Sequence, residues 1–260
     1  MSIQSSVKTC LALLFAGGLT NLSPTTVAPA RAENPAPGIS EESVAAIASM
    51  GKTLLSKQFS FRARLFRAYP GPNGELLHFA QNTKTVIYRP DRLSVDESGD
   101  NGSIKMLYNG QTLVLYGVEQ NQYTSVFVTG NIDKIANVAE RLLKVDLPLV
   151  DLLTDDPANS VLSGVISGGQ VGTSIIDGVR CRHFFFNQAD NLELELWLED
   201  NERALPRRFV VTYRNVARRP NFIAELSDWD FSGQAPESTF VFNPPAGAVQ
   251  VEIKTSETAK

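Results

Sequence analysis

The fold class of this chain follows from the stretch Leu192-Glu-Leu-Glu-Leu-Trp-Leu198. Leucine occupies every second position of this stretch, and charged or aromatic side chains stand between the leucines. Successive side chains of a β-strand point to opposite faces, so the pattern predicts a strand with one apolar face and one polar face. Such a strand needs neighbouring strands at its edges and an apolar layer over its leucines.

Strand patterns continue on both sides of this stretch, from residue 59 to residue 128 and from residue 160 to residue 231. Turn signals separate them, and the Asn109-Gly110 step is a strong hairpin signal. About 11 strands with hairpin spacing predict a mainly β protein. The expected form is one strongly curved antiparallel sheet, or half-open β-barrel.

One helical pattern precedes the strands, and two more interrupt them. Ser40 before two glutamates is a typical helix start and predicts a helix to about Lys57. Apolar residues at helical spacing predict a second helix over 131–145, and 147–157 is a leucine-rich short helix or lid-like loop. We expect these helices to cover the concave face of the sheet, because both they and the sheet carry an apolar face.

The start of the chain has the pattern of a secretory signal peptide. Lys8 precedes an apolar run from Cys10 to Leu19, and Ala30-Arg31-Ala32 forms an A-x-A cleavage signal. We expect export to the periplasm with cleavage after Ala32. The predicted organisation is a signal peptide over 1–32, a mobile lead-in over 33–40, a single β domain over 41–251 and a polar tail over 252–260.

The composition argues against several classes of protein. The formal net charge is −4, which argues against nucleic acid as a partner. After residue 32, no apolar run is long enough to span a membrane. Of the 2 cysteines only Cys181 lies after the predicted cleavage site, so no internal disulfide is expected.

Cys181 and His183 lie on one face of a predicted strand and could be two ligands of a metal site. A metal site needs at least a third ligand, and the nearest acid, Asp177, stands in a turn. A packed cysteine and a hydrogen-bonded histidine explain the pair better. We therefore predict no metal and no cofactor. The glycine-rich segment 164–172 lacks the helix start of a phosphate site and is interpreted as a flexible hairpin.

Glu193 and Glu195 share one strand face with Trp197, as the two carboxylates of a glycosidase lie near an aromatic platform. They face away from the leucine row, so a solvated outer face explains them better. A hydrolase could also use His183, but the chain has no G-x-S-x-G motif. No catalytic residue is predicted, and a hydrolase stays the least favoured hypothesis.

Five segments carry a resemblance to a known family: Tyr108–Tyr116, the predicted helix and the Leu-Pro segment up to Leu153, Leu205–Tyr213, Phe222–Trp229 and the Phe-x-Phe-x-Pro-Pro-x-Gly ending at 240–247. Together they resemble a family of predicted periplasmic proteins of unknown function. That family is similar in architecture to the outer-membrane lipoprotein carriers of the LolA/LolB type. The resemblance implies an unclosed β-barrel whose apolar concave face is covered by helices. The chain differs from those carriers in its long turns, and no residue aligns with their lid-locking arginine.

The resemblance implies a cavity that takes up acyl chains. By alternation, nine apolar residues face inward and are the candidate ligand-binding residues: Phe61, Leu65, Met106, Leu113, Leu115, Leu194, Leu196, Phe209 and Val211. The same residues could form an ordinary filled core. The favoured function is a non-enzymatic periplasmic protein that binds an acyl chain, a lipid or a lipidated protein. The alternative is an envelope protein-interaction or sensor module with a filled cavity.

Overall fold

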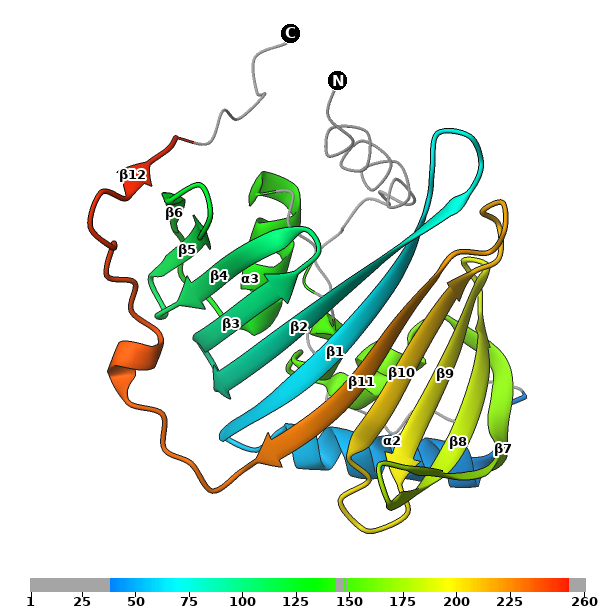
Figure 1. The fold of residues 1–260 in the computed structure, drawn as a ribbon. Helices are drawn as coiled ribbons and strands as arrows, with labels where there is room; N and C mark the ends of the chain where they lie inside the picture. The colour runs from blue at the N-terminus through cyan, green and yellow to red at the C-terminus, as the bar shows by residue number, and fades with distance from the viewer. Residues whose placement is uncertain (1–37, 144–146, 148, 253–260) are drawn as a thin grey trace, which may run out of the picture.

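The computed structural model describes residues 38–143, 147 and 149–252 of the chain. They form one 12-stranded sheet with the strand order β12-β6-β5-β4-β3-β2-β1-β11-β10-β9-β8-β7. Neighbouring strands are antiparallel except for β12, which is parallel to β6. β12 and β7 are the two edges of the sheet, and Figure 1 shows the long strands β1, β2 and β11 at its centre. The predicted mainly β, largely antiparallel architecture is confirmed.

The elements follow one another along the chain with short connections. The strands are β1 (Gln58–Pro70), β2 (Leu76–Tyr88), β3 (Arg92–Gly99), β4 (Gly102–Tyr108), β5 (Thr112–Gly117), β6 (Gln122–Phe127), β7 (Val165–Ile176), β8 (Val179–Gln188), β9 (Leu192–Glu199), β10 (Pro206–Tyr213), β11 (Asn221–Asp230) and β12 (Val249–Gln250). The helical elements are α2 (Glu41–Leu54), α3 (Ile132–Val138), the π-helical turn η1 (Ala139–Leu143), the 3₁₀ turn η2 (Val150–Leu152), α4 (Pro157–Leu162) and the 3₁₀ turn η3 (Glu237–Thr239).

Helix α2 begins where the sequence predicts, because the Ser40 side chain accepts a hydrogen bond from the Ser43 backbone N–H. Its apolar face, which includes Ile47 and Met50, is completely buried. α2 runs across the direction of the central strands (Figure 1). Its buried residues belong to the same hydrophobic cluster as the inner residues of the strands, so helix and sheet share one core.

Gly51 lies where α4 packs on α2. A Cβ atom placed on Gly51 would stand 2.7 Å from the Cβ atom of Ala158, closer than real Cβ contacts come. Glycine weakens the middle of a helix by about 1 kcal/mol relative to alanine. Here the loss is compensated by the direct contact of α2 with α4, which a larger residue at 51 would block.

Strand β7 differs from the expectation in two ways. The strand pattern that the sequence shows from residue 160 begins too early, because Asp156 caps α4 and Pro157 starts this helix, which continues to Leu162. The flexible hairpin predicted for 164–172 is also wrong, because these residues continue into β7 and pair with β8. Register shifts at Ile166 and Val171 absorb the extra residues, and backbone pairing needs no side chain from the glycines.

The end of the described chain forms a strap along the strands β3 to β6. Phe240 is buried, and Phe242 packs against the rings of Tyr116 and Tyr123 at centroid distances of 5.3 and 5.0 Å. β12 then pairs with β6, an interaction that sequence reasoning did not predict. The predicted signal peptide over 1–32, its cleavage after Ala32, the lead-in up to residue 37 and the tail from residue 253 lie outside the described residues.

None of the helices in the described part of the chain has the length and apolar content that a membrane crossing needs.

Candidate functional site

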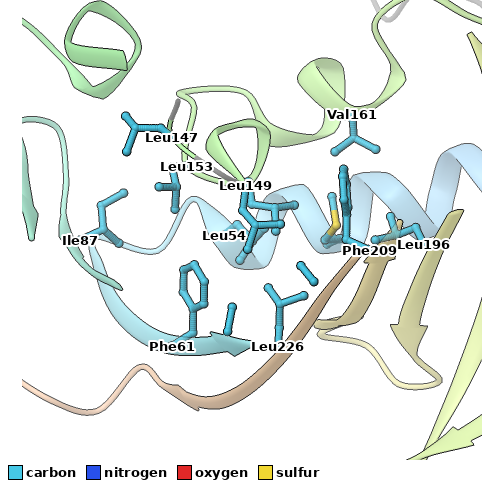
Figure 2. Close-up of a cluster of buried hydrophobic side chains, with 14 of the residues drawn as sticks. Leu54, Phe61, Ile87, Leu147, Leu149, Leu153, Val161, Leu196, Phe209 and Leu226 are labelled. Atoms are coloured by element: carbon cyan, nitrogen blue, oxygen red, sulfur yellow. The ribbon is translucent and has the colours of Figure 1, made fainter. Parts of the chain in front are cut away.

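An apolar layer joins the sheet to the segment between α3 and α4. We call the described residues from Ile132 to Leu162 the cover. Figure 2 shows the cover above α2 and β1, with Leu149 and Leu153 on the side that faces Leu54 and Phe61. The buried side chains of the cover are Ile132, Ile135, Ala139, Leu147, Leu149, Leu152, Leu153, Pro157 and Val161.

The structure brings the nine predicted ligand-binding residues together in this layer. Phe61, Leu65, Met106, Leu113, Leu194, Leu196 and Phe209 are buried, and Leu115 and Val211 are half-buried against the same cluster. They come from strands β1, β4, β5, β9 and β10. The two grooves at the surface of the cover are lined by residues of the cover and by Ser163, which follows it, and by none of the nine. A direct contact between the nine residues and a ligand therefore stays a prediction.

Local sequence shapes the cover. The Asn131 side chain accepts a hydrogen bond from the Lys134 N–H, and the Asp156 side chain accepts one from the Asn159 N–H, so both helices are capped. Leu149 has a φ of 64°, in the left-handed region that leucine rarely adopts, and only 6% of its surface is exposed. Backbone strain of this kind costs about 1 kcal/mol and persists where the surrounding packing enforces it. Burial of the Leu149 side chain supplies that packing.

Arg89, at the end of β2, fastens the cover to α2. Its Nε and Nη2 atoms donate hydrogen bonds to the Leu54 carbonyl oxygen at 3.2 and 3.1 Å. That carbonyl is in the last turn of α2, where helical carbonyls lack partners within the helix and the helix dipole is negative. The third nitrogen, Nη1, lies 3.5 Å from an Asp155 carboxylate oxygen and has no hydrogen-bond partner within the described residues.

The Arg89 side chain is 9% exposed, so its charge is held away from water. Burial lowers the pKa of Arg89, while the carboxylates of Asp155 and Asp133 act in the opposite direction. The guanidinium therefore stays charged, and its partners decide its stability. Sequence reasoning missed this residue, since a single arginine before a turn proline is a weak signal.

Asp133 completes the fastening from α3. Its carboxylate accepts a hydrogen bond from the Asp155 backbone N–H at 3.1 Å, and Asn131 binds the Asp155 side chain. Burial is the main cause that raises the pKa of Asp133 above its ordinary value, and the negative charge of Asp155 acts in the same direction. The hydrogen bond from Asp155 and the charge of Arg89 only partly offset this rise.

The raised pKa of Asp133 gives a pH-dependent prediction. An acid whose pKa is higher in the folded state than in the unfolded state contributes stability at low pH, and this contribution is lost as the pH rises through the folded pKa. The free energy of unfolding of Asp133→Asn, relative to the natural protein, should therefore increase as the pH rises from about 4 to about 7. Urea unfolding across this range measures it, and Asp190→Asn, in an exposed turn, controls for the loss of one charge. A difference that decreases with pH would contradict the assignment.

Two grooves open between the elements of the cover. One, of about 360 Å³, is lined by Asp133, Asp151, Thr154, Asp156, Asn159, Ser160 and Ser163. The other, of about 190 Å³, is lined by Asp133, Ala136, Asn137, Glu140, Leu147, Val150 and Thr154. They share Asp133 and Thr154, and the second groove reaches the apolar residues Leu147 and Val150.

The residues considered for metal binding or hydrolysis do not line either groove of the cover. His183 Nε2 is 2.9 Å from a Glu195 oxygen and its ring stacks on Trp197 at 3.9 Å, so the hydrogen-bonded histidine is confirmed. Cys181 is buried, and burial raises the pKa of its thiol. Glu193 forms an ion pair with Arg219. In the described part of the chain, no group of three potential metal ligands converges.

The sequence identifies the family. The model of a family described as predicted periplasmic protein (DUF2092) matches residues 44–254, which include the whole sheet and the cover. The chain belongs to the DUF2092 family. The predicted resemblance to a family of periplasmic proteins is therefore confirmed. None of the curated protein sequences matches the chain significantly.

Several solved structures are similar to this DUF2092 protein at low sequence identity. MucB is 13% identical with a TM-score of 0.44, and the match covers 79% of this chain and 65% of MucB. An uncharacterised conserved protein from Thermus thermophilus is 9% identical with a TM-score of 0.46, and the match covers 79% of this chain and 96% of that protein.

A LolA superfamily protein from Nitrosomonas europaea is 10% identical with a TM-score of 0.36, and the match covers 77% of this chain and 97% of that protein. All three TM-scores lie below 0.5. The function of the site therefore has to follow from the residues of this chain alone.

Proposed function

We propose that this protein is a non-enzymatic periplasmic protein that binds the hydrocarbon chain of a lipid or a lipidated protein between its sheet and its cover. In this proposal the sheet is a half-open barrel, and α2 and the cover lie over its concave face. The nine inward-facing residues from Phe61 to Val211 form the floor of the site. The predicted cleavage after Ala32 releases the protein into the periplasm.

The observation that carries the proposal is the composition of the cover. Leu147, Leu149, Leu152 and Leu153 are buried against the sheet, yet the outer margin of the cover is held by exposed polar contacts, such as those of Asp155 with Asn131 and Asp133. Polar contacts at a margin can exchange with water at little cost, whereas an apolar face needs a partner. An acyl chain supplies such a partner when the cover moves, at about 0.8 kcal/mol for each methylene removed from water.

Hydrogen–deuterium exchange in the presence of 1-N-phenylnaphthylamine, an uncharged apolar dye, tests the proposal. We expect the dye to bind, and the amides of α3, η2 and α4 to exchange faster in the complex, because the dye takes the place of cover side chains. The paired amides of β1 and β11 are an internal control and should not change. If the dye does not bind, or binds without any change in the cover, the proposal is wrong.

One observation favours the alternative, an envelope protein-interaction module. On the edge strand β7, Ile166, Val171 and Ile175 are 56%, 59% and 65% exposed. An exposed apolar edge strand can accept a strand of another protein. Replacing Val171 and Ile175 by lysine should abolish capture of such a protein from an envelope extract and leave dye binding intact. Loss of dye binding in this variant would contradict the separation of the two surfaces.

A further inference from the structure

The margins of the cover differ in how tightly they are closed. Along α2, the contact of Gly51 with Ala158 leaves no room even for a methyl group. At the end of β2, Arg89 connects Leu54 with Asp155. Between α3 and η2, in contrast, the groove of about 190 Å³ separates the two elements and reaches Leu147 and Val150. Through this groove solvent reaches Leu147 and Val150, two residues of the apolar layer.

Among the described residues that line the two grooves, every charged side chain is acidic. Asp133 and Glu140 line the groove that reaches Leu147, and Asp151 and Asp156 line the adjoining groove of about 360 Å³. Lys134 and Arg141, the bases on α3 and η1, line neither groove. The Lys134 amine instead donates a hydrogen bond to the Thr129 carbonyl oxygen. Within the described residues these carboxylates do not gather into a group of three metal ligands, but they make the electrostatic potential at the opening of the groove negative.

The geometry points to the groove between α3 and η2 as the entrance for the ligand, and to a single-chain amphiphile whose head carries no negative charge as the ligand class. This inference rests on the proposed function and specifies it. The chain enters past Ala136 toward Leu147 and Val150, and the head stays among Asp133, Asn137 and Glu140. The Asn137 amide can donate or accept a hydrogen bond, and the carboxylates of Asp133 and Glu140 can accept hydrogen bonds from a hydroxyl, an amide or an ammonium head.

The same carboxylates would repel a negatively charged head group. Two like charges about 7 Å apart at a protein surface repel enough to weaken binding by about tenfold. The contacts of the hydrocarbon chain with the apolar floor are the same for every head group. The charge of the head alone should therefore determine the order of the affinities. The measured order of affinities therefore reports on the entrance and is independent of the apolar site itself.

Displacement of 1-N-phenylnaphthylamine by dodecylamine, dodecanol and dodecanoate, each below its aggregation concentration, tests the inference. We expect dodecylamine to bind most tightly, dodecanol next, and dodecanoate about tenfold more weakly than dodecanol. The variant Glu140→Lys should remove most of the penalty for dodecanoate, because it reverses a charge at the entrance. Asp190→Lys, a matched reversal in the exposed β8–β9 turn, should leave the order unchanged.

Each outcome has a definite consequence. If dodecanoate binds the natural protein as tightly as dodecanol, or if the two lysine variants behave alike, the inference about the entrance is overturned while the apolar site stands. If the dye and all three dodecyl compounds fail to bind, the proposed function itself is wrong, and the inference falls with it.

Discussion

Phe61→Ala is expected to destabilise the protein by about 3–5 kcal/mol, the cost of a large cavity in a packed core. Phe61 is 2% exposed, and its ring stacks on Trp229 at a centroid distance of 4.6 Å and lies 6.3 Å from the ring of Phe59. It is also part of the floor over which the cover lies (Figure 2). Urea unfolding followed by tryptophan fluorescence measures the change, because Trp229 is in direct contact.

Phe127→Ala is the matched control for this prediction. Phe127 ends β6 and is 78% exposed, so the same substitution there should change the free energy of unfolding by less than about 0.5 kcal/mol. Equal losses in the two variants would show that Phe61 does not lie in a close-packed layer.

Arg89→Met should release the cover and reduce the free energy of unfolding by about 2–3 kcal/mol, because the Leu54 carbonyl oxygen loses both of its hydrogen bonds from the guanidinium. Methionine retains most of the apolar stem of arginine. A buried carbonyl group left without a partner costs about 1–3 kcal/mol. The Asp155 side chain is 46% exposed and can be hydrated, so the loss of its ion pair with Arg89 adds little to this cost. We further expect faster hydrogen exchange in α4 and tighter binding of 1-N-phenylnaphthylamine.

Arg180→Met provides the comparison for Arg89→Met. Arg180 is 64% exposed and pairs with Asp200 at 2.9 Å, and exposed ion pairs of this kind contribute at most about 1 kcal/mol. Dye binding that is the same in both variants would show that Arg89 does not fasten the cover.

Much of the sheet could be predicted from the sequence because alternation is a local signal. The leucines of 192–198 are buried or half-buried, as their spacing predicts, and Glu193 and Glu195 pair with side chains on the other face. The cap of α2 at Ser40 could be predicted equally well, since capping depends on residues that are neighbours in the sequence. These parts of the fold are specified over a few residues of sequence.

The fastening of the cover could not be predicted in the same way. Arg89 binds a backbone carbonyl 35 residues away, and a carbonyl group carries no signature in the sequence. The bond from Asp155 to Asp133 spans 22 residues and depends on how α3 and the cover meet. Glycines 168, 169 and 172 indicated a loop, yet backbone pairing with β8 placed them in a strand. In each case a tertiary contact decides the outcome.

Native mass spectrometry of the protein purified from the cell envelope, with solvent extraction and lipid analysis, decides between a ligand site and a filled core. We predict one bound amphiphile per chain, with a hydrocarbon chain and a head that carries no negative charge. We also predict that added dodecanol binds at one molecule per chain. A mass equal to that of the protein alone, unchanged after dodecanol or phospholipid is added, would contradict the proposed function and show that the layer between sheet and cover is a filled core.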